Sequence, residues 1–199
     1  MAKPESFKIS SALKNLIGKD LITDEFVAVY ELVKNSFDAY AKTVEIIFDT
    51  DIKNNEPQII IRDDGKGMND NDLQKKWLFV AYSAKKLGSE NIDYREKIKV
   101  NRVFAGAKGV GRFSCDRLGS KLNLITIKNE ATPKIENLVV DWDQFELDPL
   151  KEFYQISVTH SILSNAPYNL KHGTVLEISG LRDISVSYTH LTLPTNREV

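Results

Sequence analysis

Cysteine, long apolar runs and net charge are all scarce in this chain of 199 residues. The single cysteine, Cys115, excludes a disulfide within the chain and supplies too few thiolates for a structural zinc site, so we expect a small buried residue on a helix. No apolar run approaches the roughly 18 residues that cross a bilayer, and the polar first ten residues lack the apolar region of a signal peptide. We therefore expect a cytoplasmic protein without membrane contacts.

Positive and negative charges are nearly balanced, with 27 lysines and arginines against 28 aspartates and glutamates. The formal net charge is −1, and the basic residues are spread along the chain rather than clustered. Neither nucleic acid nor an acidic membrane is therefore indicated as a partner. Hydrophobic residues make up 42% of the chain, enough for one ordinary domain with a sizeable core.

The first part of the chain predicts an amphipathic helix followed by a hairpin. Apolar residues recur near helical spacing over 24–39, and Thr23 or Asp24 can cap the start. The β-branched runs 43–49 and 58–63 flank a polar, turn-forming segment, which is the pattern of an antiparallel hairpin. The recurring apolar residues of the helix are Val27, Val29, Tyr30, Val33 and Phe37.

After the hairpin, the pattern changes from helices to strands. A short helix is expected over 69–78, a mobile, lysine-rich segment over 82–105, and a helix that ends near Leu118. Four strands are expected after it, over 121–128, 138–142, 153–160 and 174–178. Consecutive strands favour an α+β two-layer sandwich, with a mixed, mostly antiparallel sheet and helices on one face, over a doubly wound parallel sheet.

The last residues of the chain have an unusual sequence. The run Val186 to Thr195 is similar to the conceptual translation of a sequencing-library adapter, although its alternation also fits a genuine strand. We expect residues 1–185 to form one domain and 186–199 to be a non-native tail on a truncated gene product. A full-length gene that still encodes this tail would refute the expectation.

Three polar residues share one face of the first predicted helix. Glu31, Asn35 and Asp38 are spaced i, i+4 and i+7, on an element whose other face is apolar. A carboxylate can accept a proton from water, and a carboxamide oxygen one turn away can bind a hard cation such as magnesium. A solvated helix face explains the same pattern, so the three residues alone decide nothing.

Two glycine clusters give this polar face a context. Asp63-Asp64-Gly65-Lys66-Gly67 ends a strand, so that a flat ligand can approach the backbone while a carboxylate accepts a hydrogen bond from an exocyclic amino group such as that of adenine. The cluster from Gly106 to Gly111 opens a helix and offers backbone N–H groups to phosphate oxygens. Each cluster by itself also fits a simple tight turn.

Four segments in this order resemble the ATP-binding domain of the GHKL superfamily, which includes gyrase, the ninety-kilodalton heat-shock chaperone, sensor histidine kinases and the mismatch-repair protein MutL. The run 31–39 is similar to its N box, 63–68 and 106–113 to its two glycine boxes, and 172–177 to its late Gly-Thr strand. The resemblance implies the Bergerat ATP-binding fold, with ATP and Mg²⁺ as cofactors and 82–105 as a lid.

The resemblance also implies residue roles. Glu31 would be the general base that activates water, Asn35 the side-chain ligand of magnesium, and Asp38 a residue that shapes the pocket. Asp63 would bind the adenine amino group, helped through water by Thr174. The open wall of the pocket, the packing on the base and the contacts along the phosphates would come from Gly65, Gly67, Met68, Gly106, Lys108, Gly109, Val110 and Gly111.

The remaining basic side chains are expected to have structural roles. His160 and His172 lack metal-ligand spacing with acids or with the cysteine, so packing or surface roles are expected. Arg112 and Arg117 follow the second glycine cluster on its helix, where surface salt bridges are expected, with phosphate contact left open for Arg112.

Within the superfamily, Glu31 favours a weak ATPase whose nucleotide drives a lid or dimerisation switch in a larger protein. A histidine kinase catalytic domain is the rival enzyme, but no histidine precedes His160. A nucleotide-gated interaction module with negligible turnover is the other alternative, because related ATPases borrow a phosphate-sensing lysine from a following domain. The arrangement resembles the chaperone- and MORC-like branches, and the expected partners are ATP, missing C-terminal domains and a second copy of the intact protein.

Overall fold

The computed structural model describes residues 8–16, 22, 24–49, 56–79 and 111–182. These residues form a six-stranded sheet in the order β1-β2-β6-β3-β4-β5, and each of its five neighbouring pairs is antiparallel. The strands are β1 (Val44–Asp49), β2 (Gln58–Asp63), β3 (Gly119–Ile127), β4 (Ile135–Asp141), β5 (Thr159–Leu163) and β6 (Gly173–Leu181). Because β6 lies between β2 and β3, it joins the early hairpin to the later strands.

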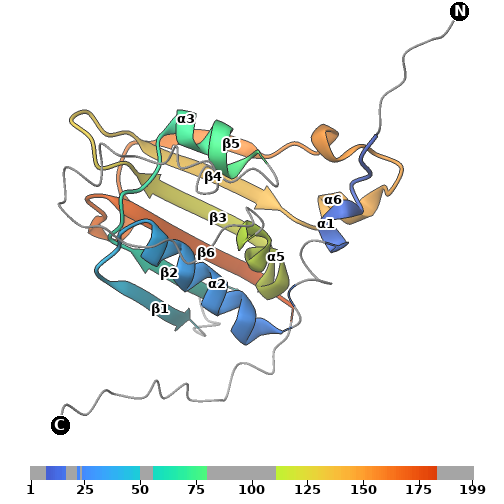
Figure 1. The fold of residues 1–199 in the computed structure, drawn as a ribbon, viewed down its shortest axis with the longest axis horizontal. Coiled ribbons are helices and arrows are strands. Elements are labelled where there is room, and N and C mark those ends of the chain that lie inside the picture. The colour runs from blue at the N-terminus through green and yellow to red at the C-terminus, as the bar shows by residue number, and fades with distance from the viewer. Residues whose placement is uncertain (1–7, 17–21, 23, 50–55, 80–110, 183–199) are drawn as a thin grey trace, which may run out of the picture.

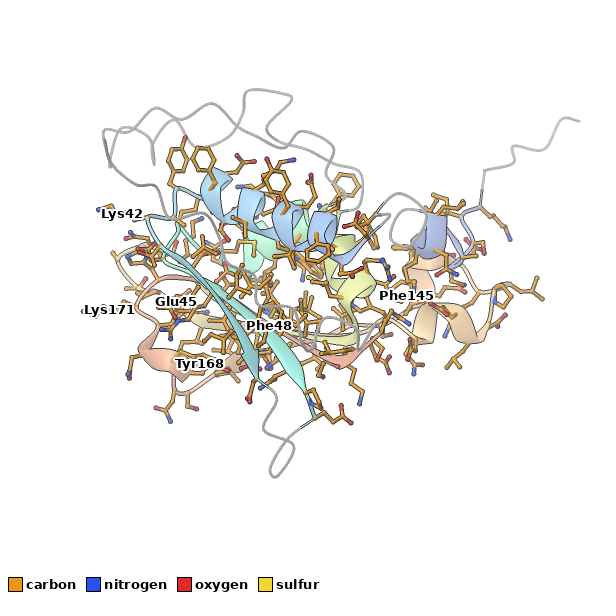
Figure 2. The ribbon with its side chains drawn as sticks, turned by 90° about the horizontal axis from the view of Figure 1, so that it is seen from below. Lys42, Glu45, Phe48, Phe145, Tyr168 and Lys171 are labelled. Atoms are coloured by element: carbon orange, nitrogen blue, oxygen red, sulfur yellow. The ribbon has the colours of Figure 1, made fainter. Side chains whose placement is uncertain are left out.

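Helices cover one face of this sheet. α2 (Glu25–Asp38) and α5 (Ser114–Leu118) lie over the central strands, and the view from the side places them on one side of the sheet (Figures 1 and 2). The other helical elements are α1 (Leu13–Asn15), α3 (Asp70–Asp72), α6 (Gln144–Leu147), a π-helical turn η2 (Leu73–Trp77) and the 3₁₀ turns η3 (Gly111–Phe113), η4 (Phe153–Gln155) and η5 (Pro167–Asn169). The predicted α+β two-layer sandwich is confirmed. Within the described ranges, none of the helices has the length and hydropathy to cross a membrane.

Aspartate side chains fix the start of the long helix α2 and the turn that follows its end. The Asp24 carboxylate accepts a hydrogen bond from the Val27 N–H at 2.8 Å, which caps the first turn. Past the other end, Tyr40 takes a positive φ of 65°. The Asp64 carboxylate then accepts from the N–H groups of Lys42 and Thr43 at 2.6 and 2.8 Å, which fixes the turn into β1.

The buried face of α2 is narrower than its apolar residues suggest. Ala28, Leu32 and Ser36 face the sheet and are almost inaccessible to solvent. Three of the apolar residues that mark the helix in the sequence, Val27, Tyr30 and Phe37, are exposed on the other side. Helical spacing therefore identified the helix correctly but did not identify its core-facing side.

The main core lies between this helical layer and the sheet. Side chains from α2, α5 and four strands form one cluster, which includes Leu32, Leu118, Ile61, Leu124 and Ile178. A smaller cluster on the opposite face of the sheet contains Ile60, Ile125 and Val175. Cys115 is buried in the main core, and burial raises the pKa of its thiol to about 12, in agreement with the structural role expected for it.

One predicted strand is wrong. The segment 153–160 was expected to be extended, but its first three residues form the turn η4, and β5 begins only at Thr159. Glu152 and Gln155 cap this turn reciprocally. The Phe153 ring packs against the rings of Phe113 and Phe145. The alternation of apolar and polar residues in this segment therefore comes from a packed turn and not from a strand. The other three strands are present with longer bounds than predicted, and the helix expected over 69–78 consists of α3 and η2.

Candidate functional site

The carboxylate of Asp63 is held in a fixed orientation at the end of β2. One oxygen, Oδ2, accepts a hydrogen bond from Ser36 Oγ at 2.9 Å, and Oδ1 accepts one from the Gly65 N–H at 2.9 Å. Burial raises the pKa of Asp63, an effect opposed by these two donors and by the Thr174 backbone N–H. The carboxylate is thus positioned by the protein but remains costly to ionise, a combination typical of a binding group.

Two glycines let three backbone segments approach one another around this carboxylate. Gly67 has a φ of 62°, and a Cβ added there would overlap the carbonyl oxygen of Ile127 at the end of β3. Gly173 has a φ of 114°, and its added Cβ would overlap the carbonyl oxygen of Asp63. Side chains at these positions would separate the strand ends, so glycine is required at both for a close-walled site.

Thr126 of β3 connects the two glycine segments. Its Oγ1 accepts a hydrogen bond from the Met68 N–H at 2.9 Å, donates to the Gly173 carbonyl at 3.0 Å and lies 3.1 Å from Thr174 Oγ1. Because the single proton of Thr126 is given to Gly173, the Thr174 hydroxyl is the donor of the last bond, and its lone pairs remain acceptors. The sheet register places Thr174 opposite both Asp63 and Thr126.

His172 and Asp64 fix the turn on its outer side. The Nδ1 of His172 lies 2.8 Å from the Gly65 carbonyl oxygen, so this nitrogen carries the proton and donates it. Burial works against ionisation of Asp64, but the N–H groups of Thr43 and Lys42 outweigh it and lower the pKa of this carboxyl. Two adjacent aspartates therefore differ in role: Asp64 fixes the backbone, and Asp63 faces the site.

Three further polar residues of the candidate site lie on α2. Glu31 is half-buried, and its Oε1 accepts a hydrogen bond from Lys34 Nζ at 2.7 Å. Asn35 is exposed, and a Cβ added to Gly111 would lie 3.0 Å from its Nδ2, so Gly111 lies against α2 here. Asp38 is 3% exposed. Since Ser36 of the same helix binds Asp63, α2 links these residues to the turn after β2.

Most predicted site residues fall within the described part of the chain. Four residues of the second glycine cluster lie outside it, namely Gly106, Lys108, Gly109 and Val110. The predicted lid 82–105 and tail 186–199 lie outside it as well. Of the cluster, only Gly111 can be placed.

Sequence reasoning missed three residues that build the site: Ser36, Thr126 and His172. Ser36 left no usable signal, because the core-facing side of α2 was not identified from the sequence. Thr126 left none, since threonine is ordinary in a strand. His172 precedes the Gly-Thr pair directly, but its bond to Gly65 depends on a strand pairing that spacing does not reveal.

A magnesium ion brought by a nucleotide fits this residue set. In the described ranges, no group of three or more His, Cys, Asp or Glu side chains could hold a metal ion. Magnesium bound with a nucleotide needs no such cage, because phosphates and waters supply most of its ligands. Asn35, exposed beside Gly111, offers one amide oxygen.

Comparison with known proteins agrees with this geometry. A family model described as histidine kinase-, DNA gyrase B-, and HSP90-like ATPase matches residues 23–168. The matched part includes α2, the hairpin, the Asp63 turn and Thr126, while His172 and Thr174 follow it. A search of curated proteins gave no match. The chain therefore belongs to the family of histidine kinase-, DNA gyrase B- and HSP90-like ATPases.

Proposed function

We propose that this domain binds ATP with magnesium and hydrolyses it slowly, and that the bound nucleotide drives a conformational or dimerisation switch in a larger protein. The observation that carries the proposal is the Asp63 carboxylate, which Ser36 and Gly65 orient and burial makes costly to ionise. A carboxylate has about four acceptor positions, so its two oxygens can accept a further N–H from a ligand. Adenine presents such a donor at its exocyclic amino group.

The surroundings of Asp63 support a flat ligand. Gly67 and Gly173 keep side chains away from the two backbone segments beside the carboxylate. Thr174 retains acceptor lone pairs next to Asp63, which fits the expected water-mediated contact to the base. Met68 is half-buried with its backbone fixed by Thr126, so its side chain can pack on a ring. These features together favour adenine over guanine, which presents a carbonyl oxygen where adenine has its amino group.

For hydrolysis, Glu31 and Asn35 of α2 have the required chemistry. The Glu31 carboxylate can take a proton from an attacking water, and its bond to Lys34 restricts its orientation. Asn35 would supply a side-chain oxygen to magnesium, and the ion would neutralise phosphate charge. The dimerising partner in this proposal is a second copy of the intact protein.

Calorimetric titration of the whole chain with Mg-ATP and Mg-GTP tests the pocket, and phosphate release from the same samples tests the chemistry. The proposal predicts ATP binding at least tenfold tighter than GTP binding, because the guanine carbonyl oxygen would face the Asp63 carboxylate without donating a hydrogen bond to it. Equal affinities, or no binding, would overturn it. Binding without phosphate release would replace the ATPase with a nucleotide-gated interaction module.

A further inference from the structure

Arg112 differs from the other described arginines in its lack of an acidic partner. Arg62 lies 2.6 Å from Glu45, and Arg182 lies 2.8 Å from Asp116. Arg117 pairs with Glu25 at 3.6 Å, as expected for a surface salt bridge. Arg112 follows Gly111 directly in η3 and, among the described residues, forms no ion pair.

The guanidinium of Arg112 has only weak partners for a half-buried charge. Its Nη1 donates to the carbonyl oxygen of Phe79 at 3.4 Å, and the group lies 5.9 Å from the ring centroid of Trp77. Burial lowers the pKa of Arg112 to about 10, so the side chain keeps its charge at neutral pH. Within the described part of the chain, one long hydrogen bond leaves most of its five N–H donors unused.

Arg112 lies close to the candidate site. Gly111 packs against the amide of Asn35 on α2, while the next side chain reaches Trp77 and Phe79 at the end of η2. Arg112 therefore lies between α2 and η2, beside the residue proposed to approach the phosphates. A cation–π contact with Trp77 at 5.9 Å occupies none of the guanidinium N–H groups and leaves them for an anion.

We propose that Arg112 is a further nucleotide-binding residue, and that its guanidinium binds a phosphate group of the nucleotide. A half-buried charge without an acidic partner has lost part of its hydration, and an arriving phosphate would supply a negative partner. The planar donor edge of arginine matches phosphate oxygens better than the point charge of lysine does. This assignment rests on the proposed function, because it takes the phosphates of the nucleotide to lie beside Asn35.

Titrations with Mg-ATP, adenosine and tripolyphosphate test the assignment on the full chain. Arg112→Gln should weaken ATP and tripolyphosphate binding by about tenfold to a hundredfold and leave adenosine binding unchanged. The matched control is Arg117→Gln, which removes a neighbouring arginine that already has a partner and should leave ATP affinity near that of the wild type. Unchanged ATP affinity in Arg112→Gln, or equal losses for ATP and adenosine, would overturn the assignment.

Two more variants separate charge from packing. Arg112→Lys keeps the charge, and Arg112→Met keeps the apolar stem against Trp77, so a phosphate contact requires the lysine variant to bind ATP more tightly than the methionine variant. The reverse order would show a packing role. If the wild type binds tripolyphosphate through Arg112 but neither ATP nor adenosine, the anion contact stands and the adenine pocket fails. If it binds none of the three, both proposals fail.

Discussion

Replacing Asp63 by asparagine separates ligand recognition from folding at one side chain. The amide oxygen can accept from the Gly65 N–H as Oδ1 does now at 2.9 Å. The amide nitrogen can donate to Ser36 Oγ, whose own proton can turn to the Leu32 carbonyl oxygen, already 3.4 Å away. Both internal hydrogen bonds therefore survive the change.

The hydrogen bond between this side chain and the ligand does not survive the change. In Asp63→Asn an NH₂ group can face the amino group of adenine, so a hydrogen bond to a charged acceptor is lost. Such bonds contribute about 1.5–3 kcal/mol, which corresponds to roughly a tenfold to hundredfold loss of ATP affinity. Stability should behave differently, because the variant no longer buries a carboxylate. We expect its free energy of unfolding to equal or exceed that of the wild type.

The raised pKa of Asp63 also determines how the free energy of unfolding changes with pH. Burial raises the pKa of Asp63 above the ordinary value of 3.8, so between these two pKa values the folded protein binds more protons than the unfolded chain. Wild-type stability therefore falls as the pH rises through this window, and the cost persists above it. The advantage of Asp63→Asn should be largest at neutral pH and disappear as the pH falls below 3.8.

Urea unfolding across this pH range and calorimetric titration with Mg-ATP measure the two effects. Asp64→Asn is the control, because Asp64 fixes the backbone and its pKa is lowered, so this variant should lose some stability at neutral pH and keep its ATP affinity. The reasoning would be refuted if Asp63→Asn bound ATP as tightly as the wild type, or if it lost binding only because it unfolded.

Three further substitutions test the chemistry and the fold. Glu31→Gln should retain Mg-ATP affinity but release phosphate at least about a hundredfold more slowly, because the general base is lost; single-turnover assays check this. Gly67→Ala should lower the free energy of unfolding by more than about 2 kcal/mol, since its φ of 62° and the Ile127 carbonyl both oppose a side chain; urea titration measures the loss. Lys14→Met should cost about 1.5–3 kcal/mol by the same assay, because the buried Asp116 loses its lysine partner at 3.1 Å but keeps Arg182 at 2.8 Å.

The first and third of these substitutions have matched controls. Lys34→Gln removes the partner of Glu31 but not the base, so turnover should persist, and its complete loss would question the role of Glu31. Lys8→Met removes a lysine that is 79% exposed and should change the free energy of unfolding by less than about 0.5 kcal/mol. An equally small effect of Lys14→Met would contradict the importance assigned to the buried pair.

Local features of the fold could be predicted from the sequence. The Asp24 cap, the hairpin and the turn after Asp63 depend on residues close together in the chain, and each is confirmed. The core-facing side of α2 was not predictable, because Tyr30 and Phe37 are apolar yet exposed, while Ser36 is polar yet buried. The choice between these faces depends on what the sheet presents to the helix.

The candidate site follows the same division. Asp63, Gly67 and Asn35 became candidates because each belongs to a motif whose members lie within a few residues of one another. Thr126 and His172 act through partners more than forty residues away in the chain. Thr126 accepts a hydrogen bond from the Met68 N–H at 2.9 Å, and His172 donates one to the Gly65 carbonyl oxygen at 2.8 Å. Spacing within a motif cannot reveal such pairings, because they are set by the register of strands that are neighbours in the sheet but far apart in the sequence.

The central position of β6 has a consequence for the order of folding. β2 and β3 make no ladder with each other, and both pair with β6, whose residues 173–181 follow all other described strands. During synthesis, the early hairpin and the β3–β5 meander must therefore wait as separate halves with open edges. Thr174 arrives with the strand that joins them. Nucleotide affinity in a nascent chain would consequently report that the sheet is complete.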